Sequence, residues 1–108
     1  MAAFFNLTLD TLAPQGVTLK INAGAIYTAN KAVTLTIGCS DASTAGYSMK
    51  IWGSIVGAAA EKDANWENFS ATKTVTLADG DGLKTIYVKV RDNVWNEAEP
   101  VSATITLN

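Results

Sequence analysis

Short runs in which apolar and polar residues alternate one by one are the feature that most constrains this chain. The clearest run covers residues 32–41, in which every second residue from Val33 to Cys39 is apolar. A period of two is typical of a β-strand that buries one face, because successive side chains point to opposite faces of a sheet. The sequence therefore predicts strands rather than helices as the elements of the fold.

Similar runs recur along the chain and are separated by turn residues. The expected strands cover residues 17–21, 32–41, 48–56, 71–77, 84–91 and 101–107, with a weaker run, a strand or an arm, at 4–9. The strongest turn signal between them is Asp79-Gly80-Asp81-Gly82. Residues 57–70 are less regular, and we interpret them as a long connection that contains at most one short helix.

Seven or eight short strands with one polar face each are expected to form two antiparallel sheets that pack face to face. A chain of 108 residues suits one such domain, the immunoglobulin-like β-sandwich. We predict this domain over residues 13–108, preceded by an arm or linker over residues 1–12. Because the chain has a single cysteine, it forms no internal disulfide, and apolar burial must stabilise the fold. The predicted core consists of Val17, Leu19, Val33, Leu35, Ile37, Met49, Ile51, Val75, Leu77, Ile86, Val88, Val90, Val101 and Ile105.

The composition argues against several classes of function. The chain has no histidine and one cysteine, which excludes histidine acid–base catalysis and zinc sites built from these residues. Its net charge is −2 and its eight lysines and arginines are scattered, which argues against nucleic-acid binding. No apolar run approaches the roughly 20 residues of a membrane span. We find no nucleophile–base pair, and we expect no enzymatic activity, no catalytic residues, no cofactor and no metal.

Three segments of the chain share a recognisable pattern. They are Asp10-Thr11-Leu12-Ala13-Pro14, residues 32–41, and residues 79–92 with the sequence DGDGLKTIYVKVRD. Together they resemble the immunoglobulin-like (Big-type) repeats of bacterial surface proteins and phage virion proteins, and the resemblance covers most of the chain. In those repeats a Gly-Asn pair follows the arginine–aspartate pair after two residues, whereas this chain has Trp95-Asn96 there.

The resemblance implies a fold and a setting, but it does not identify a ligand. Our first expectation is a non-enzymatic phage virion accessory protein that decorates a capsid or tail and contacts other virion proteins or host-surface material. The absence of a secretion signal at the start of the sequence favours this setting, because virions leave the cell by lysis. The alternatives are a stalk or adhesion repeat at the bacterial cell surface and a module that binds cell-surface glycans. Assembly of several copies is compatible with any of these.

Five aromatic residues are the candidates for contact with a partner. Phe4 and Phe5 are adjacent in the predicted arm, where they pack under their own sandwich or against a neighbouring subunit. Trp52 points outward from its predicted strand, Trp66 lies in the long connection, and Trp95 lies in a polar loop. Each tryptophan is interpreted either as a cover for the core or as a contact to a partner, because tryptophan is enriched at binding hot spots.

The other polar and sulfur-containing candidates have simpler interpretations. Cys39, on the inward side of its predicted strand, is expected to be a buried apolar side chain rather than a reactive thiol. Asp92 and Asn96 are expected to hold the loop that contains Trp95. Plain turn chemistry, rather than calcium binding, is expected at the loop aspartates Asp41, Asp79, Asp81 and Asp92.

Overall fold

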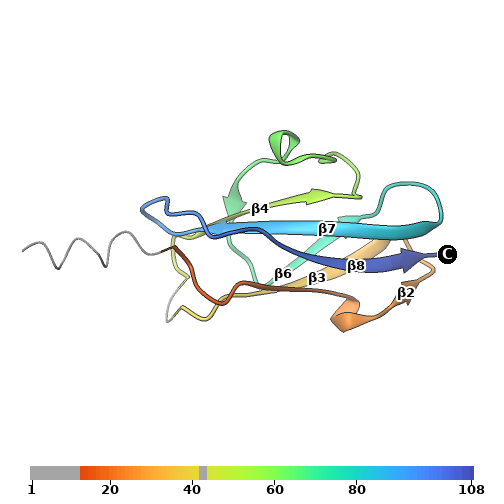
Figure 1. Cartoon of the computed structure of the whole chain (residues 1–108), viewed down its shortest axis with the longest axis horizontal. Coiled ribbons are helices and arrows are strands. Elements are labelled where there is room, and N and C mark those ends of the chain that lie inside the picture. Colours follow the sequence, from red (N-terminus) through yellow and green to blue (C-terminus); the bar gives the residue numbers. More distant parts are fainter. Residues whose placement is uncertain (1–12, 42–43) are drawn as a thin grey trace, which may run out of the picture.

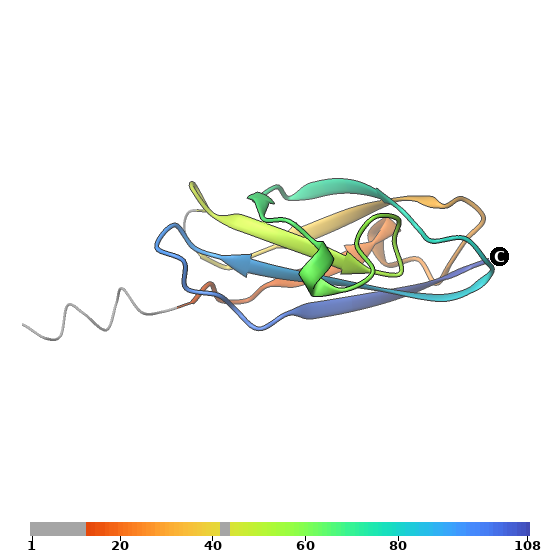
Figure 2. The same cartoon turned by 90° about the horizontal axis from the view of Figure 1, so that it is seen from above.

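The computed structural model describes residues 13–41 and 44–108, in which eight strands form two sheets packed face to face (Figures 1 and 2). The strands are β1 (Thr18–Ile21), β2 (Tyr27–Thr28), β3 (Ala32–Gly38), β4 (Ser48–Gly53), β5 (Glu67–Asn68), β6 (Thr72–Thr76), β7 (Gly82–Arg91) and β8 (Val101–Leu107). Two 3-10 turns, η2 (Asn22–Gly24) and η3 (Glu61–Asp63), are the only helical segments in the described part of the chain. The predicted all-β sandwich is confirmed, whereas Phe4, Phe5 and the rest of the predicted arm lie outside the described residues.

The strand order is that of an immunoglobulin-like sandwich. One sheet has the order β1-β3-β6 and the other has the order β2-β8-β7-β4-β5. The pairs are antiparallel except for β2 and β8, which run parallel over two residues. This exception to the predicted antiparallel arrangement arises because the chain leaves the first sheet after β1 and joins the edge of the second. The change of sheet occurs at η2, where Asn22, Ala23 and Gly24 have left-handed backbones.

Two strands end earlier than the alternation predicts, each for a different reason. β3 stops at Gly38, which pairs with Thr18, the first residue of β1. β4 stops at Gly53, whose φ of 130° turns the chain away from the sheet. Ile55 then forms an isolated bridge with Leu77, so the chain passes here from one sheet to the other.

The core lies between the sheets and agrees with the prediction except at its margins. The predicted residues are buried apart from Val17, Leu19, Val75 and Val101, which are partly buried and pack against the cluster. Leu19 and Val75 lie in the edge strands β1 and β6, and Val17 directly precedes β1. Val101 is the first residue of β8, so all four have neighbours on fewer sides than the central core residues. Further residues complete the core where the chain crosses or ends a strand: Ile21, Ile55 and Leu107.

The prediction of a buried position for Cys39 is wrong. The residue follows the end of β3 and is only partly buried. Its thiol donates a weak hydrogen bond to the main-chain oxygen of Gln15, with the sulfur 3.3 Å from the oxygen. The alternation continued past the point at which pairing with β1 stops, and this is why the sequence pattern misplaced it.

Candidate functional site

The outer side of the five-stranded sheet gathers aromatic and cationic side chains. The register of β4 and β7 places Lys50 opposite Lys89 and Trp52 opposite Tyr87, on the side that faces away from the core. Two further tryptophans reach the same side from outside these strands, one directly before β5 and one in the loop between β7 and β8. We call this surface the tryptophan face and define it by Lys50, Trp52, Trp66, Tyr87, Lys89, Arg91 and Trp95.

Trp52 forms the base of this face rather than its exposed surface. Its ring stacks on Tyr87 with centroids 5.6 Å apart and planes 10° apart. Although the side chain points outward, only 8% of the residue is exposed, whereas Tyr87 is 38% exposed. The connection between β4 and β5 returns across this side of the sheet, and its turn η3 lies against β4 (Figure 2). The predicted outward direction of Trp52 is correct, but its ring supports Tyr87 instead of meeting solvent.

Arg91 contacts the rings of both other tryptophans, Trp66 and Trp95. Its guanidinium carbon lies 4.2 Å from the centroid of the Trp66 ring and 4.7 Å from that of the Trp95 ring. Lys50 also approaches Trp66, with its Nζ 4.7 Å from the ring centroid. Contacts of this length between a cation and an aromatic face are attractive. Trp95 is 70% exposed, so one part of its ring contacts Arg91 and the rest is open to a partner.

The loop that carries Trp95 is held by Asp92, as predicted. The Oδ1 atom of Asp92 accepts hydrogen bonds from the main-chain N–H of Val94 (3.0 Å) and of Asn96 (2.9 Å). The Nδ2 of Asn96 donates to Oδ2 of Asp92 at 3.1 Å. Burial alone raises the pKa of this carboxyl, but the hydrogen bonds from Asn96, Val94 and Trp95 outweigh burial and lower the pKa. The carboxylate therefore stays charged and fixes the loop.

Trp95 adopts a left-handed backbone with φ of 70°. This conformation suits glycine, and it costs a residue with a Cβ roughly 1–2 kcal/mol. The bacterial and phage repeats that the sequence resembles have glycine at the matching place, and the tight Asp92 loop explains why the backbone requires it. Trp95 is thus mostly exposed and has a backbone conformation that is unfavourable for a residue with a Cβ.

Glu61 and Glu97 form ion pairs with the two lysines of the tryptophan face. The Glu61 carboxylate accepts a hydrogen bond from Lys89 at 2.8 Å and lies 3.6 Å from Lys50 Nζ, and Glu97 lies 3.3 Å from Lys89. The hydrogen bond from Lys89 lowers the pKa of Glu61, and the same bond raises the pKa of Lys89. Lys89 is therefore protonated at neutral pH and serves as a fixed cation rather than as a base.

Among the described residues, Arg91 has no carboxylate partner comparable to those of the lysines. Within the described residues its guanidinium takes part in no ion pair, and its buried Nε has no hydrogen-bond partner. The residue is only partly buried. Its charge is thus the uncompensated one on the tryptophan face.

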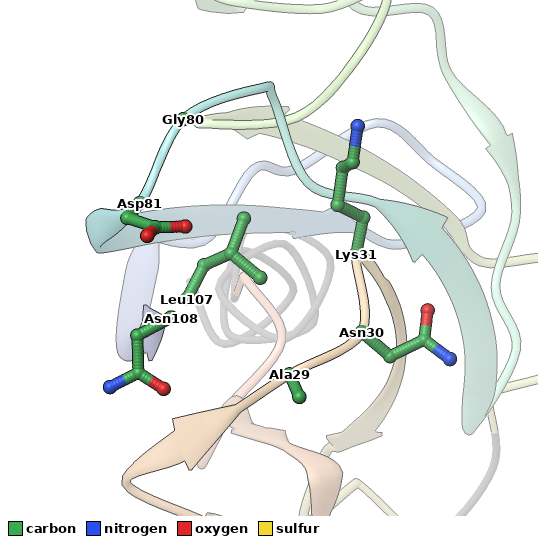
Figure 3. Close-up of a pocket in the computed structure, with 7 residues that line it drawn as sticks. All are labelled: Ala29, Asn30, Lys31, Gly80, Asp81, Leu107 and Asn108. Atoms are coloured by element: carbon green, nitrogen blue, oxygen red, sulfur yellow. The ribbon is translucent and has the colours of Figure 1, made fainter.

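A shallow pocket of about 540 Å³ lies at the opposite end of β7 (Figure 3). It is lined by Ala29, Asn30, Lys31, Gly80, Asp81, Leu107 and Asn108. The side chains of Asn30, Lys31 and Asn108 point in different directions instead of converging (Figure 3). The arrangement therefore indicates no particular ligand.

Two of the other loop aspartates, Asp41 and Asp79, contact neighbouring protein groups. Asp41 accepts hydrogen bonds from the main-chain N–H of Gln15 (3.1 Å) and from the hydroxyl of Tyr47 (2.7 Å). The bond to Asp41, with burial and the nearby negative charge, raises the pKa of Tyr47 to about 12. Asp79 pairs with Lys31. In the described ranges no three histidine, cysteine, aspartate or glutamate residues are grouped so that they could hold a metal ion, and no helix is long and apolar enough to span a membrane.

Comparison of the sequence with protein-family models found no match. Comparisons with curated proteins and with solved structures found no match either. The β-sandwich is established by its own strands and their order, whereas membership of the bacterial and phage repeats stays a prediction.

Proposed function

We propose that this chain is a non-enzymatic accessory domain of a phage virion that binds host-surface material through the tryptophan face. The observation that carries the proposal is Trp95, which is 70% exposed although its backbone is left-handed. Strained residues persist where the surroundings hold them, and they cluster at functional sites. Here Asp92 holds the loop, and Arg91 contacts the ring.

The chemistry of the face favours binding over catalysis. Tryptophan, tyrosine and arginine are the residues most enriched at binding hot spots, and this face contains all three types. Lys89, the cation at its centre, is paired with Glu61 and Glu97 and stays protonated, so it is unsuited to act as a nucleophile. The virion setting rests on the resemblance of residues 10–14, 32–41 and 79–92 to phage and bacterial repeats.

The second candidate is a stalk or adhesion repeat of a bacterial surface protein. Residue 13 and the C-terminus lie at opposite ends of the sandwich (Figure 1). This placement suits domains that follow one another head to tail, as they do in a surface stalk. In that setting the tryptophan face lies on the flank of the stalk and remains available for contact.

The test compares binding of the wild-type chain with that of two alanine variants. Trp95→Ala removes the exposed ring, and Tyr27→Ala removes another exposed aromatic, which lies in β2 outside the face. Each protein is sedimented with virions and with host cell envelopes from the biological source of the chain. We expect the wild type and Tyr27→Ala to bind envelopes alike, and Trp95→Ala to bind roughly 30-fold more weakly, as at a hot spot of about 2 kcal/mol.

Two results would overturn the proposal. One is a wild-type chain that binds neither virions nor envelopes. The other is Trp95→Ala binding as tightly as the wild type. Recovery of the chain as part of a larger envelope protein would favour the surface-repeat alternative over the virion setting.

A further inference from the structure

The geometry around Arg91 determines which donors it can offer. A guanidinium carries five N–H donors in one plane, and its two flat sides have none. In this protein the guanidinium carbon lies over the rings of both Trp66 and Trp95, and the Nε of the same side chain is buried. The terminal N–H groups of this partly exposed side chain are therefore the donors that a ligand can meet. An acceptor that meets them can take two parallel hydrogen bonds, as carboxylates do with arginine.

Charge also favours an anion at this position. The two lysines of the face are compensated by Glu61 and Glu97. Asp92 follows Arg91 in sequence, but its carboxylate is buried and turned toward the N–H groups of its own loop. An isolated positive charge thus stays on this face of a chain whose net charge is −2. Because the Arg91 side chain is partly exposed, a ligand carboxylate can reach its terminal N–H groups and compensate this charge.

The aromatic residues on both sides of Arg91 indicate the rest of the ligand. Trp95 and Tyr87 are the exposed rings, at 70% and 38% exposure. Tyr87 and Arg91 point to the same side of β7 and are four residues apart, which corresponds to about 13 Å along a strand. A ligand that extends along β7 from Tyr87 passes Lys89, which is ion-paired, and then meets Arg91 with the Trp95 ring against it. Saccharides with flat C–H faces and a carboxylate fit this order, because aromatic rings offer apolar contact area and arginine pairs with the acid.

Arg91 is the one cation of the tryptophan face without an ion-pair partner among the described residues, and this limits how many negative charges the ligand carries there. A nucleic acid places a phosphate on every nucleotide, and its binding needs several clustered cations. On this face only Arg91 lacks a partner among the described residues, so a glycan in which acidic sugars are spaced by neutral ones fits better.

We propose that the tryptophan face binds an acidic glycan, with a sugar carboxylate paired to Arg91 and neighbouring sugar rings against Trp95 and Tyr87. The inference rests on the proposed function, because it specifies the chemistry of the material that the same face binds. Trp66 and Lys50 have supporting roles: the ring of Trp66 orients the guanidinium, and Lys50 contacts Trp66 from its own strand.

The experiment measures quenching of tryptophan fluorescence by a panel of oligosaccharides. The panel contains members with glucuronic, galacturonic and sialic acid, each beside its carboxyl-reduced counterpart. We expect at least one acidic member to bind about 10-fold or more tightly than its reduced form, as a charge-assisted pair implies. Arg91→Lys keeps the charge but loses the planar fork, so it should lose most of that preference. Tyr27→Ala serves as the matched control, and thermal unfolding verifies that each variant is folded.

The outcomes separate this inference from the proposed function. Binding of envelopes by the wild type that depends on Trp95, with no acidic member of the panel bound, overturns the inference and leaves the proposed function standing. Equal binding of acidic and reduced forms, or an unchanged preference in folded Arg91→Lys, also overturns it. Envelope binding that survives enzymatic removal of glycans indicates a protein partner and has the same consequence. Failure to bind both envelopes and panel removes both proposals.

Discussion

The backbone at position 95 offers a direct test of the reasoning on the tryptophan face. Trp95 has a φ of 70°, in the left-handed region where a Cβ is unfavourable. Replacement by glycine and replacement by alanine both remove the ring and its contact with Arg91. The two variants differ only in the Cβ, so their difference in stability isolates the backbone strain from the loss of the side chain.

The magnitude follows from two opposing effects. The left-handed conformation costs alanine roughly 1–2 kcal/mol more than glycine in the folded state. Glycine loses about 0.4–1 kcal/mol more entropy when the unfolded chain becomes ordered. The balance leaves Trp95→Gly more stable than Trp95→Ala by about 1 kcal/mol. For a domain of 108 residues this corresponds to a melting temperature about 4–6 °C higher.

Urea unfolding, monitored by the fluorescence of the remaining tryptophans, and thermal melts measure the difference. Val94 provides a control with the opposite expected sign, because it is exposed in the same loop but does not have a positive φ. At that position alanine should be more stable than glycine. If Trp95→Ala proves more stable than Trp95→Gly by about 0.4–1 kcal/mol, which is the entropic difference alone, position 95 is unstrained in solution and the strain argument for a functional tryptophan fails.

Three further predictions concern the rest of the fold. In a spectroscopic pH titration, Tyr47 should ionise with a pKa of about 12, and Asp41→Asn should bring this value back toward 10.0. The pKa of Tyr47 is higher in the folded than in the unfolded state, so the hydrogen bond to Asp41 stabilises the fold fully below pH 10.0 and ceases to do so as the pH rises toward 12. In denaturant unfolding, the free energy of unfolding should therefore fall more steeply over this range for the wild type than for Asp41→Asn. Gly53→Ala should destabilise the protein by more than about 2 kcal/mol in urea unfolding, since the new Cβ overlaps a main-chain oxygen of β7 at a positive φ. Gly24→Ala, which also has a positive φ but open space around it, should cost about 1 kcal/mol. Equal losses in the two variants would contradict the packing described for Gly53. Glu61→Gln should lower the melting temperature at neutral pH but not at about pH 2, because the lowered pKa of Glu61 stabilises the fold only while the carboxyl is charged; a difference that persists in acid would assign the effect to packing instead.

Alternation was sufficient to locate the long strands and most of the core. β3, β7 and β8 each bury one face over seven or more residues, and such a pattern is set by local backbone geometry alone. The two-residue strands β2 and β5 were not predicted, because two residues carry no period. They exist only because the chain passes close to the edges of the five-stranded sheet and pairs with β8 and β4 there.

Some features of the tryptophan face were likewise predictable from the sequence, and others were not. The sequence by itself determined that Trp52 points away from the core and that Asp92 holds the following loop, since both depend on residues a few positions apart. Only the tertiary structure decided that Trp52 is buried with its ring stacked on Tyr87, and that Trp66 and Trp95 meet at Arg91. The physical reason is that loops have no repeating backbone geometry, so the contacts of their side chains depend on how the chain returns across the sheet.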